Sequence, residues 1–233
     1  MLRNGWLAVL GVAAIAVAGC DSAHVNGDVT ATESGAGTVN GSIHVPAGKH
    51  SGSLGTVNGS IYIDEGATVG PASTVNGGID VGAHATADSL TTVNGRVTLG
   101  TGAHVSHAVT TVNGAMNLES GAEVGGGLKN VNGQITLTAA HVAGGLRTVS
   151  GDIDVQGDSH IEGGILVEER STGWFSWSSN RSRKPRIVIG PGAVVQGDLR
   201  FERAVELYVS DRASVGPISG ATAIRFSGGR PPG

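Results

Sequence analysis

One short motif recurs along the chain at an almost constant interval. The triplet Val-Asn-Gly, which becomes Val-Ser-Gly at its last occurrence, begins at positions 25, 39, 57, 75, 93, 112, 131 and 149. Successive copies therefore lie 14, 18, 18, 18, 19, 19 and 18 residues apart. A nearly fixed period is typical of a solenoid, in which each repeat is one coil that buries its apolar side only by stacking on its neighbours.

The composition favours short strands over helices. Glycine accounts for 40 of the 233 residues and aromatic residues for only 3%, whereas 39% of the residues are hydrophobic. Each glycine inside a helix costs about 1 kcal/mol, and a chain this apolar does not behave as a disordered polymer. We therefore expect an all-β fold with a narrow core of aliphatic side chains.

Within one repeat the apolar residues come in pairs two positions apart, which places both members of a pair on one side of a strand. For the coil that begins at Val57 we expect the inward pairs to be Ile61 and Ile63, Ala67 and Val69, and Ser73 and Val75. Three pairs predict three short strands and a triangular cross-section. The prediction is a single-stranded parallel β-helix over residues 25–227, with about 18 residues per coil, about ten coils and a length of about 50 Å.

The repeated Asn-Gly pair predicts the corner of each coil. Both residues tolerate the left-handed backbone angles that a tight corner needs. Stacked asparagines at the strand spacing of about 4.8 Å hydrogen-bond to one another, so we predict a structural ladder of Asn40, Asn58, Asn76, Asn94, Asn113 and Asn132. We expect a second ladder of threonines, formed by Thr38, Thr56, Thr74, Thr92, Thr111 and Thr148.

Two families share this rhythm. The segment IGPGAVVQGDL at 189–199 resembles a coil of the bactofilins, polymer-forming cytoskeletal proteins with a right-handed triangular β-helix. The repeated Thr-Val-Asn-Gly-x-Ile-x-Val resembles adhesin-like β-strand-repeat domains. Together these resemblances cover about residues 25–226, and the bactofilin resemblance implies a right-handed helix and self-association. Typical bactofilins are cytoplasmic, which argues against a cytoskeletal role if the chain is exported.

A left-handed helix is the alternative to the right-handed form. Hexapeptide acyltransferases have left-handed coils with three six-residue sides, and the matching hexad starts here are Val69-Gly70, Val81-Gly82, Leu99-Gly100 and Val124-Gly125. The 19-residue coils and the two resemblances favour the right-handed form, so we expect that hand.

The N-terminus has the pattern of an export signal. Arg3 lies in a positively charged start, residues 5–18 form an apolar run too short to span a membrane, and Val17-Ala18-Gly19-Cys20 follows. This ending resembles the lipobox of bacterial lipoproteins. The resemblance implies a signal peptide over 1–19, acyl chains such as palmitate on Cys20, and an anchor segment over 20–24. We therefore expect a membrane-anchored lipoprotein of the bacterial cell envelope that faces the periplasm or the surface. The anchor lies in either the inner or the outer membrane.

The repeat is interrupted between residues 168 and 186. Insertions in solenoids form loops on one face, often the binding face. The candidate interaction loop contains Trp174, Phe175, Trp177, Arg181, Arg183, Lys184 and Arg186. Aromatic side chains next to cations suit a cell-wall glycan, an anionic lipid or a protein partner. The alternative is that the aromatic side chains cover the flank of the rod and the cations are simply solvated.

Residue types that carry chemistry are scattered along the chain. His104 and His107 form an H-x-x-H pair without a third ligand at a convincing spacing, so we predict no metal site and no cofactor. Carboxylates such as those at 64–65, 80 and 152–154 have different neighbours in each coil, which favours solvated surface. Neither a nucleophile elbow nor a P-loop occurs in the sequence. We predict a protein that is not an enzyme; a carbohydrate-active or acyl-transferring enzyme is the less favoured reading.

Charge is unevenly distributed between the two ends of the chain. Residues 21–168 contain 4 basic and 14 acidic side chains, whereas residues 169–233 contain 10 basic and 5 acidic ones. The acidic total, a formal net charge of −4, argues against nucleic acid as a partner.

The leading hypothesis is an envelope scaffold whose rods associate end to end through exposed strand edges. The alternative is an adhesin-like binding module that uses the candidate interaction loop. Residues 228–233 are predicted to be a disordered tail.

Overall fold

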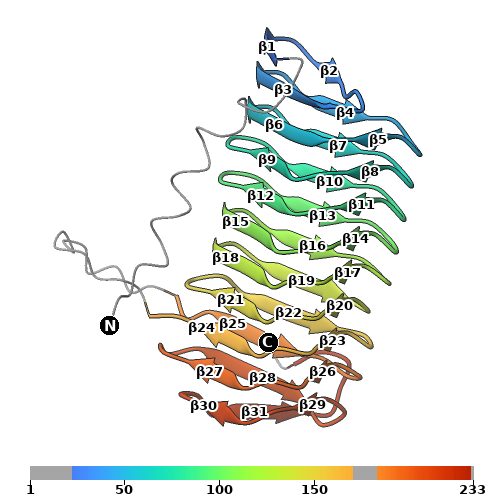
Figure 1. Ribbon diagram of the computed structural model, residues 1–233. Helices are drawn as coiled ribbons and strands as arrows, with labels where there is room; N and C mark the ends of the chain where they lie inside the picture. The colour runs from blue at the N-terminus through green and yellow to red at the C-terminus, as the bar shows by residue number, and fades with distance from the viewer. Residues whose placement is uncertain (1–22, 170–182, 232–233) are drawn as a thin grey trace, which may run out of the picture.

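The protein is an all-β parallel solenoid of about ten coils. The computed structural model describes residues 23–169 and 183–231, and none of these residues lies in a helix. The strands stack from β1, in blue at one end of the rod, to β31, in red at the other (Figure 1). Every named strand pairing is parallel, and each coil of about 18 residues, apart from the first and the last that the structure describes, contributes one strand to each of three sheets. The predicted three-sided β-helix is confirmed.

The three sheets are called A, B and C. Sheet A consists of β1 (Ala23–Asn26), β3 (Gly35–Asn40), β6 (Ser53–Asn58), β9 (Ala72–Thr74), β12 (Leu90–Thr92), β15 (Val109–Asn113), β18 (Leu128–Asn132), β21 (Leu146–Thr148), β24 (Ile165–Val167), β27 (Leu199–Phe201) and β30 (Ile218–Ser219). Sheet B consists of β2 (Val29–Thr30), β4 (Ile43–Val45), β7 (Ile61–Ile63), β10 (Ile79–Val81), β13 (Val97–Leu99), β16 (Met116–Leu118), β19 (Ile135–Thr138), β22 (Ile153–Gln156), β25 (Arg186–Ile189), β28 (Glu206–Ser210) and β31 (Ala223–Phe226). Sheet C consists of β5 (His50–Ser51), β8 (Thr68–Val69), β11 (Thr86–Ala87), β14 (His104–Val105), β17 (Glu123–Val124), β20 (His141–Val142), β23 (His160–Ile161), β26 (Val194–Val195) and β29 (Ser214–Val215).

The first described coil is shorter than the others and explains the 14-residue first interval. Sheet C begins only at β5, so this coil has strands in sheets A and B alone. An isolated antiparallel bridge between Thr32 and Gly35 returns the chain directly to sheet A. The coils from β3 to β29 add the third side and reach the 18–19-residue period, and the last coil, β30 and β31, again lacks a strand in sheet C.

The core is a column of aliphatic side chains that point inward from all three sheets. Ile61 and Ile63 of β7 are buried, as is Val69 of β8, and each aligns with an equivalent residue in the next coil. The prediction for sheet A was wrong by one residue. Ala72 and Thr74 point inward there, and Ser73 and Val75 are half-buried on the other face. Because side chains alternate along a strand, a one-residue slip exchanges the two faces completely.

The asparagines form a ladder along one corner of the rod. Asn40 Nδ2 donates to Asn26 Oδ1 at 2.9 Å, which places Asn26 in the ladder beside the six predicted residues. The same amide-to-amide bond, 2.9–3.1 Å long, joins Asn58, Asn76, Asn94, Asn113 and Asn132 to the asparagine one coil before each. These side chains are exposed. Each interior amide therefore both donates and accepts, as stacked amides at strand spacing allow.

The buried threonines do not form the ladder that we expected. Thr56 Oγ1 donates at 2.9 Å to the carbonyl oxygen of Gly41, the corner glycine of the preceding coil. The equivalent bonds, 2.8–3.4 Å long, run from Thr38, Thr74, Thr92 and Thr111 to the corner glycines at 27, 59, 77 and 95. Asn130 takes this position in one coil and donates to Gly114, whereas Thr148 accepts from Gly151 in its own coil. The hydroxyls thus satisfy corner carbonyls, because burial of an unpaired carbonyl is unfavourable.

The corner glycines are needed for space more than for backbone angle. Of the glycines at 27, 41, 59, 77, 95, 114 and 133, only Gly27 (φ 105°) and Gly133 (φ 135°) have left-handed backbone. The angle argument was therefore wrong for the five between them. A Cβ atom built on Gly59 would overlap the carbonyl oxygen of Gly41 in the preceding coil. Coils stack this closely at the corner only when the residue after asparagine has no side chain.

Candidate functional site

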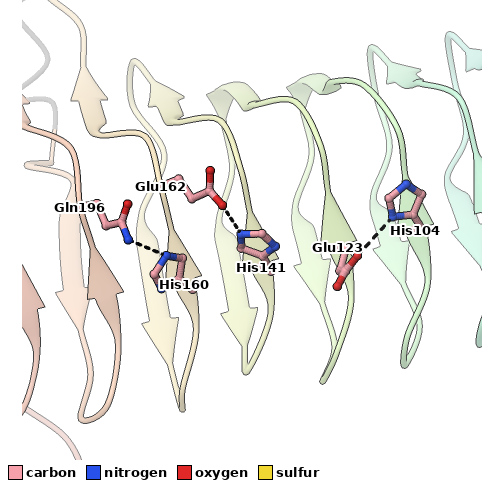
Figure 2. A network of polar contacts seen from close by, with 6 residues as sticks. All are labelled: His104, Glu123, His141, His160, Glu162 and Gln196. Atoms are coloured by element: carbon pink, nitrogen blue, oxygen red, sulfur yellow. Dashed lines mark hydrogen bonds and ion pairs between the residues drawn. The ribbon is translucent and has the colours of Figure 1, made fainter.

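A row of polar side chains lies on the outer face of sheet C. In four successive strands, β14, β17, β20 and β23, the first residue points outward and the second, an aliphatic residue, points into the core. The outward residues are His104, Glu123, His141 and His160, and each is the register partner of the next (Figure 2). Parallel pairing thereby brings residues that are 18–19 positions apart in sequence to adjacent strands about 4.8 Å apart.

Each histidine in this row contacts a polar side chain from a neighbouring coil. His104 Nδ1 lies 3.4 Å from Glu123 Oε2, and His141 Nε2 lies 3.0 Å from Glu162 Oε1. Glu162 directly follows β23, so its side chain is on the same face as His160. His160 Nε2 in turn lies 3.0 Å from Nε2 of Gln196, one coil further on (Figure 2).

Three of these residues converge. His141, His160 and Glu162 each offer one ligand atom, and these atoms all lie within 4.8 Å of one another. The ring centroids of the two histidines are 5.6 Å apart and the rings are tilted by 54°. His141 and Glu162 are partly exposed, with 39% and 49% of their side-chain surfaces accessible. The group is open to solvent on two paired strands, so it can take up a small ligand without opening the core.

No family model, curated protein or solved structure matches the chain.

The face that carries this group has few positive charges. None of the nine strands of sheet C contains lysine or arginine. Sheet A, by contrast, has Lys129, Arg147 and Arg200 at outward positions on strands β18, β21 and β27. Glu123 and Glu162 attract a cation that approaches the histidines, and the strands of sheet C contribute no positive side chain that would repel it.

The H-x-x-H pair is not one site. His104 contacts Glu123, whereas His107 Nδ1 lies 2.8 Å from Asp88 Oδ1 in the preceding coil. Sequence reasoning missed His141 and His160 because their separation is one whole coil. The signal that identifies them is their position in the repeat, since each immediately precedes the inward aliphatic residue of a sheet C strand.

Most of the carboxylates considered at the sequence level take part in local contacts. Asp64 Oδ2 lies 2.7 Å from His44 Nε2, and Asp154 Oδ2 accepts a hydrogen bond of 2.8 Å from Gln156. Asp152 accepts from the backbone N–H of Arg186 at 2.8 Å and from the Arg183 guanidinium. Among the described residues these contacts explain Asp64 and Asp152 as surface structure, whereas the second oxygen of Asp154, Oδ1, is buried without a hydrogen-bond partner.

Three cations of the candidate interaction loop lie in the described part of the chain. Arg183 forms an ion pair with Asp152, and Arg186 is the first residue of β25, with its guanidinium 5.0 Å from the centroid of the Tyr208 ring. Lys184 is exposed. Arginine over an aromatic face is a favourable contact. Two of the three cations are therefore held against the rod.

The remaining predicted site residues lie outside the described residues. They are Cys20, Trp174, Phe175, Trp177 and Arg181. Among residues 23–169 and 183–231, no helix has the length and apolar character required to cross a membrane.

Proposed function

We propose that the chain is a non-enzymatic structural scaffold of the bacterial cell envelope, lipid-anchored through Cys20, whose rods associate end to end. The observation that carries this proposal is that all three sheets end in strands with one unpaired edge. β1, β2 and β5 are the edge strands at one end, and β30, β31 and β29 are those at the other. Unpaired strand edges are templates for pairing with another chain.

The polarity of the strands favours head-to-tail contact. Because the strands of each sheet are parallel, the last coil of one copy can dock on the first coil of another and continue the ladders of sheets A and B; sheet C has no strand in either of these two coils. Such a contact joins two different surfaces, so it repeats without closing and produces a filament. A contact between two like ends would instead stop at a dimer.

The side chains of the last coil regulate this contact. Ile218 of β30 is half-buried in register with Leu199 and extends the apolar column to the end of the rod. Arg225 of β31 is exposed in register with the inward-facing Val209, and its Nη1 lies 3.5 Å from the Ser210 carbonyl oxygen. A charge at an inward position protects a strand edge from indiscriminate pairing. Association therefore has to bury Arg225 or move it aside.

The test uses a soluble form that begins at Asp21, which retains every residue that the structure describes. Light scattering and negative-stain microscopy over a concentration series should show rods that lengthen with concentration. Ile218→Lys should weaken this association and Arg225→Leu should strengthen it. The matched control is Arg96→Leu, because Arg96 is exposed on the flank of the rod between sheets A and B. Rods of constant length at every concentration, or equal effects of the two arginine substitutions, would contradict end-to-end association.

A second candidate function is an adhesin-like binding module that uses the candidate interaction loop. It is favoured by the way in which the segment is fixed on both sides: Glu168 Oε1 accepts from Arg147 Nη1 at 3.0 Å, and Arg183 pairs with Asp152. Trp174→Ala combined with Trp177→Ala should then abolish retention on isolated cell wall or on anionic vesicles. Unchanged retention of this double variant would reject the loop as the contact site.

A further inference from the structure

We infer that His141, His160 and Glu162 form a binding site for a divalent transition-metal cation of the Zn²⁺ class. Two imidazole nitrogens and one carboxylate oxygen are a ligand set that zinc accepts, and late first-row cations in general prefer imidazole. The three ligand atoms already lie within 4.8 Å of one another.

Small side-chain rotations complete the coordination. In a tetrahedral zinc site with bonds of about 2.1 Å, ligand atoms lie about 3.4 Å apart. His141 Nε2 and Glu162 Oε1, at 3.0 Å, are already closer than this distance. His141 and His160 are register partners on adjacent strands, so the sheet fixes their backbones, and only side-chain torsions have to change. Little conformational entropy is lost on binding, because the solenoid has already ordered the chain.

The surroundings of the three residues support a bound cation. The Gln196 side-chain amide nitrogen donates to His160 Nε2 at 3.0 Å. A metal bound through Nδ1 needs a proton on Nε2, and rotation of the Gln196 amide then presents its carbonyl oxygen as the acceptor that orients the ring. Glu123 lies in register with His141 on its other side and adds negative charge to the row. No strand of sheet C supplies a lysine or arginine to compete with the ion.

Three protein ligands leave one coordination position open for water or for a donor from another molecule. The site lies on the flank of the rod, on β20 and β23, several coils from either terminal edge. It is therefore independent of the proposed end-to-end association, and each can fail without the other.

The experiment titrates the full chain in detergent with ZnCl₂ by isothermal calorimetry. One ion should bind per chain, and His141→Ala, His160→Ala and Glu162→Gln should each abolish or weaken this binding. Removal of a residue that only orients a ligand lowers metal affinity by about 10–100-fold, so loss of a direct ligand should cost at least about 100-fold. Gln196→Ala, which removes only an orienting contact, should cost about 10-fold.

The matched control is His44→Ala. His44 Nε2 contacts Asp64 Oδ2 at 2.7 Å, so it forms an equivalent imidazole–carboxylate pair on the surface, but the described residues place no second histidine with that pair. This variant should bind Zn²⁺ with unchanged affinity. Circular dichroism of every variant should match that of the parent, because all the substituted side chains are at least partly exposed.

Co²⁺ substitution identifies the ligands. Nitrogen and oxygen ligands should produce visible d–d bands without the charge-transfer band of a thiolate. Such a thiolate band would assign the ion to a Cys20 that carries no lipid and would overturn the inference. Absence of bound Zn²⁺, or binding that survives all three ligand substitutions, would overturn it as well.

Discussion

Replacement of Thr92 by valine isolates the hydrogen bond that joins one coil to the corner of the coil before it. Thr92 is fully buried, and its Oγ1 donates at 2.9 Å to the carbonyl oxygen of Gly77. Valine has nearly the same shape, so no cavity forms, and the change removes only the donor. A buried acceptor left without a partner costs about 1–3 kcal/mol. Gly77 is half-buried, so water partly replaces the lost donor, and we expect a loss of about 1–2 kcal/mol.

The control for this substitution is the residue before it. Thr91 lies on the same strand, β12, but its half-buried side chain points outward, so Thr91→Val changes strand propensity by the same amount without removing a bond to a corner carbonyl. Urea denaturation reports the free energy of unfolding, and hydrogen exchange of the β12 amides reports local opening, which matters because solenoids can open coil by coil. If the two variants were equally stable within about 0.5 kcal/mol, the threonine bond would contribute nothing and the account of the corner would be wrong.

Three further substitutions test the corner and the core. Gly77→Ala places a Cβ atom against the carbonyl oxygen of Gly59, so urea denaturation should show a loss of at least about 2 kcal/mol. Asn76→Asp turns a donating amide into a carboxylate that faces Asn58 Oδ1; the cost should be about 1 kcal/mol at pH 7. Because the protonated acid donates again, folding raises the pKa of the new side chain. The loss should therefore shrink as the pH falls through this raised pKa and should be nearly absent below about pH 4, the unfolded pKa of aspartate, in a comparison of stability at several pH values. Leu128→Ala removes a fully buried side chain, and thermal and urea unfolding should show a loss of about 2–5 kcal/mol.

The sequence predicts the architecture because the information about each coil is local and repeated. The Val-Asn-Gly interval sets the length of a coil, and pairs such as Ile61 and Ile63 set the inward face of a strand. The face of sheet A was wrong because Val75 is more hydrophobic than Thr74, and hydropathy alone favours valine for the core. Thr74 points inward instead because its hydroxyl satisfies a corner carbonyl of the preceding coil, a contact that hydropathy does not report. The buried leucines of equivalent strands, such as Leu90, indicate the correct face.

The candidate site was harder to predict because it is made from two adjacent coils of the chain. His141 and His160 become neighbours only when the coils are aligned on their inward residues, Val142 and Ile161. Even that alignment does not give the orientation of the side chains. Glu162 contacts His141 of the preceding coil and not His160 of its own coil. This difference depends on side-chain torsions that no sequence pattern encodes.

The division between inward and outward positions explains where a solenoid of this kind acquires a function. Inward residues are restricted to aliphatic side chains and corner-bonding threonines, so they vary little in chemistry from coil to coil. Outward residues are free to vary, and register brings residues a whole coil apart within contact distance. A single outward histidine makes one contact, as His44 does with Asp64, whereas two in adjacent coils with a carboxylate make a chelating group. The metal that we propose on the flank and the partner that we propose at the ends therefore use different surfaces. Zn²⁺ should leave the length distribution of the rods unchanged, and a change in rod length on metal addition would show that the open coordination position is filled by a second copy.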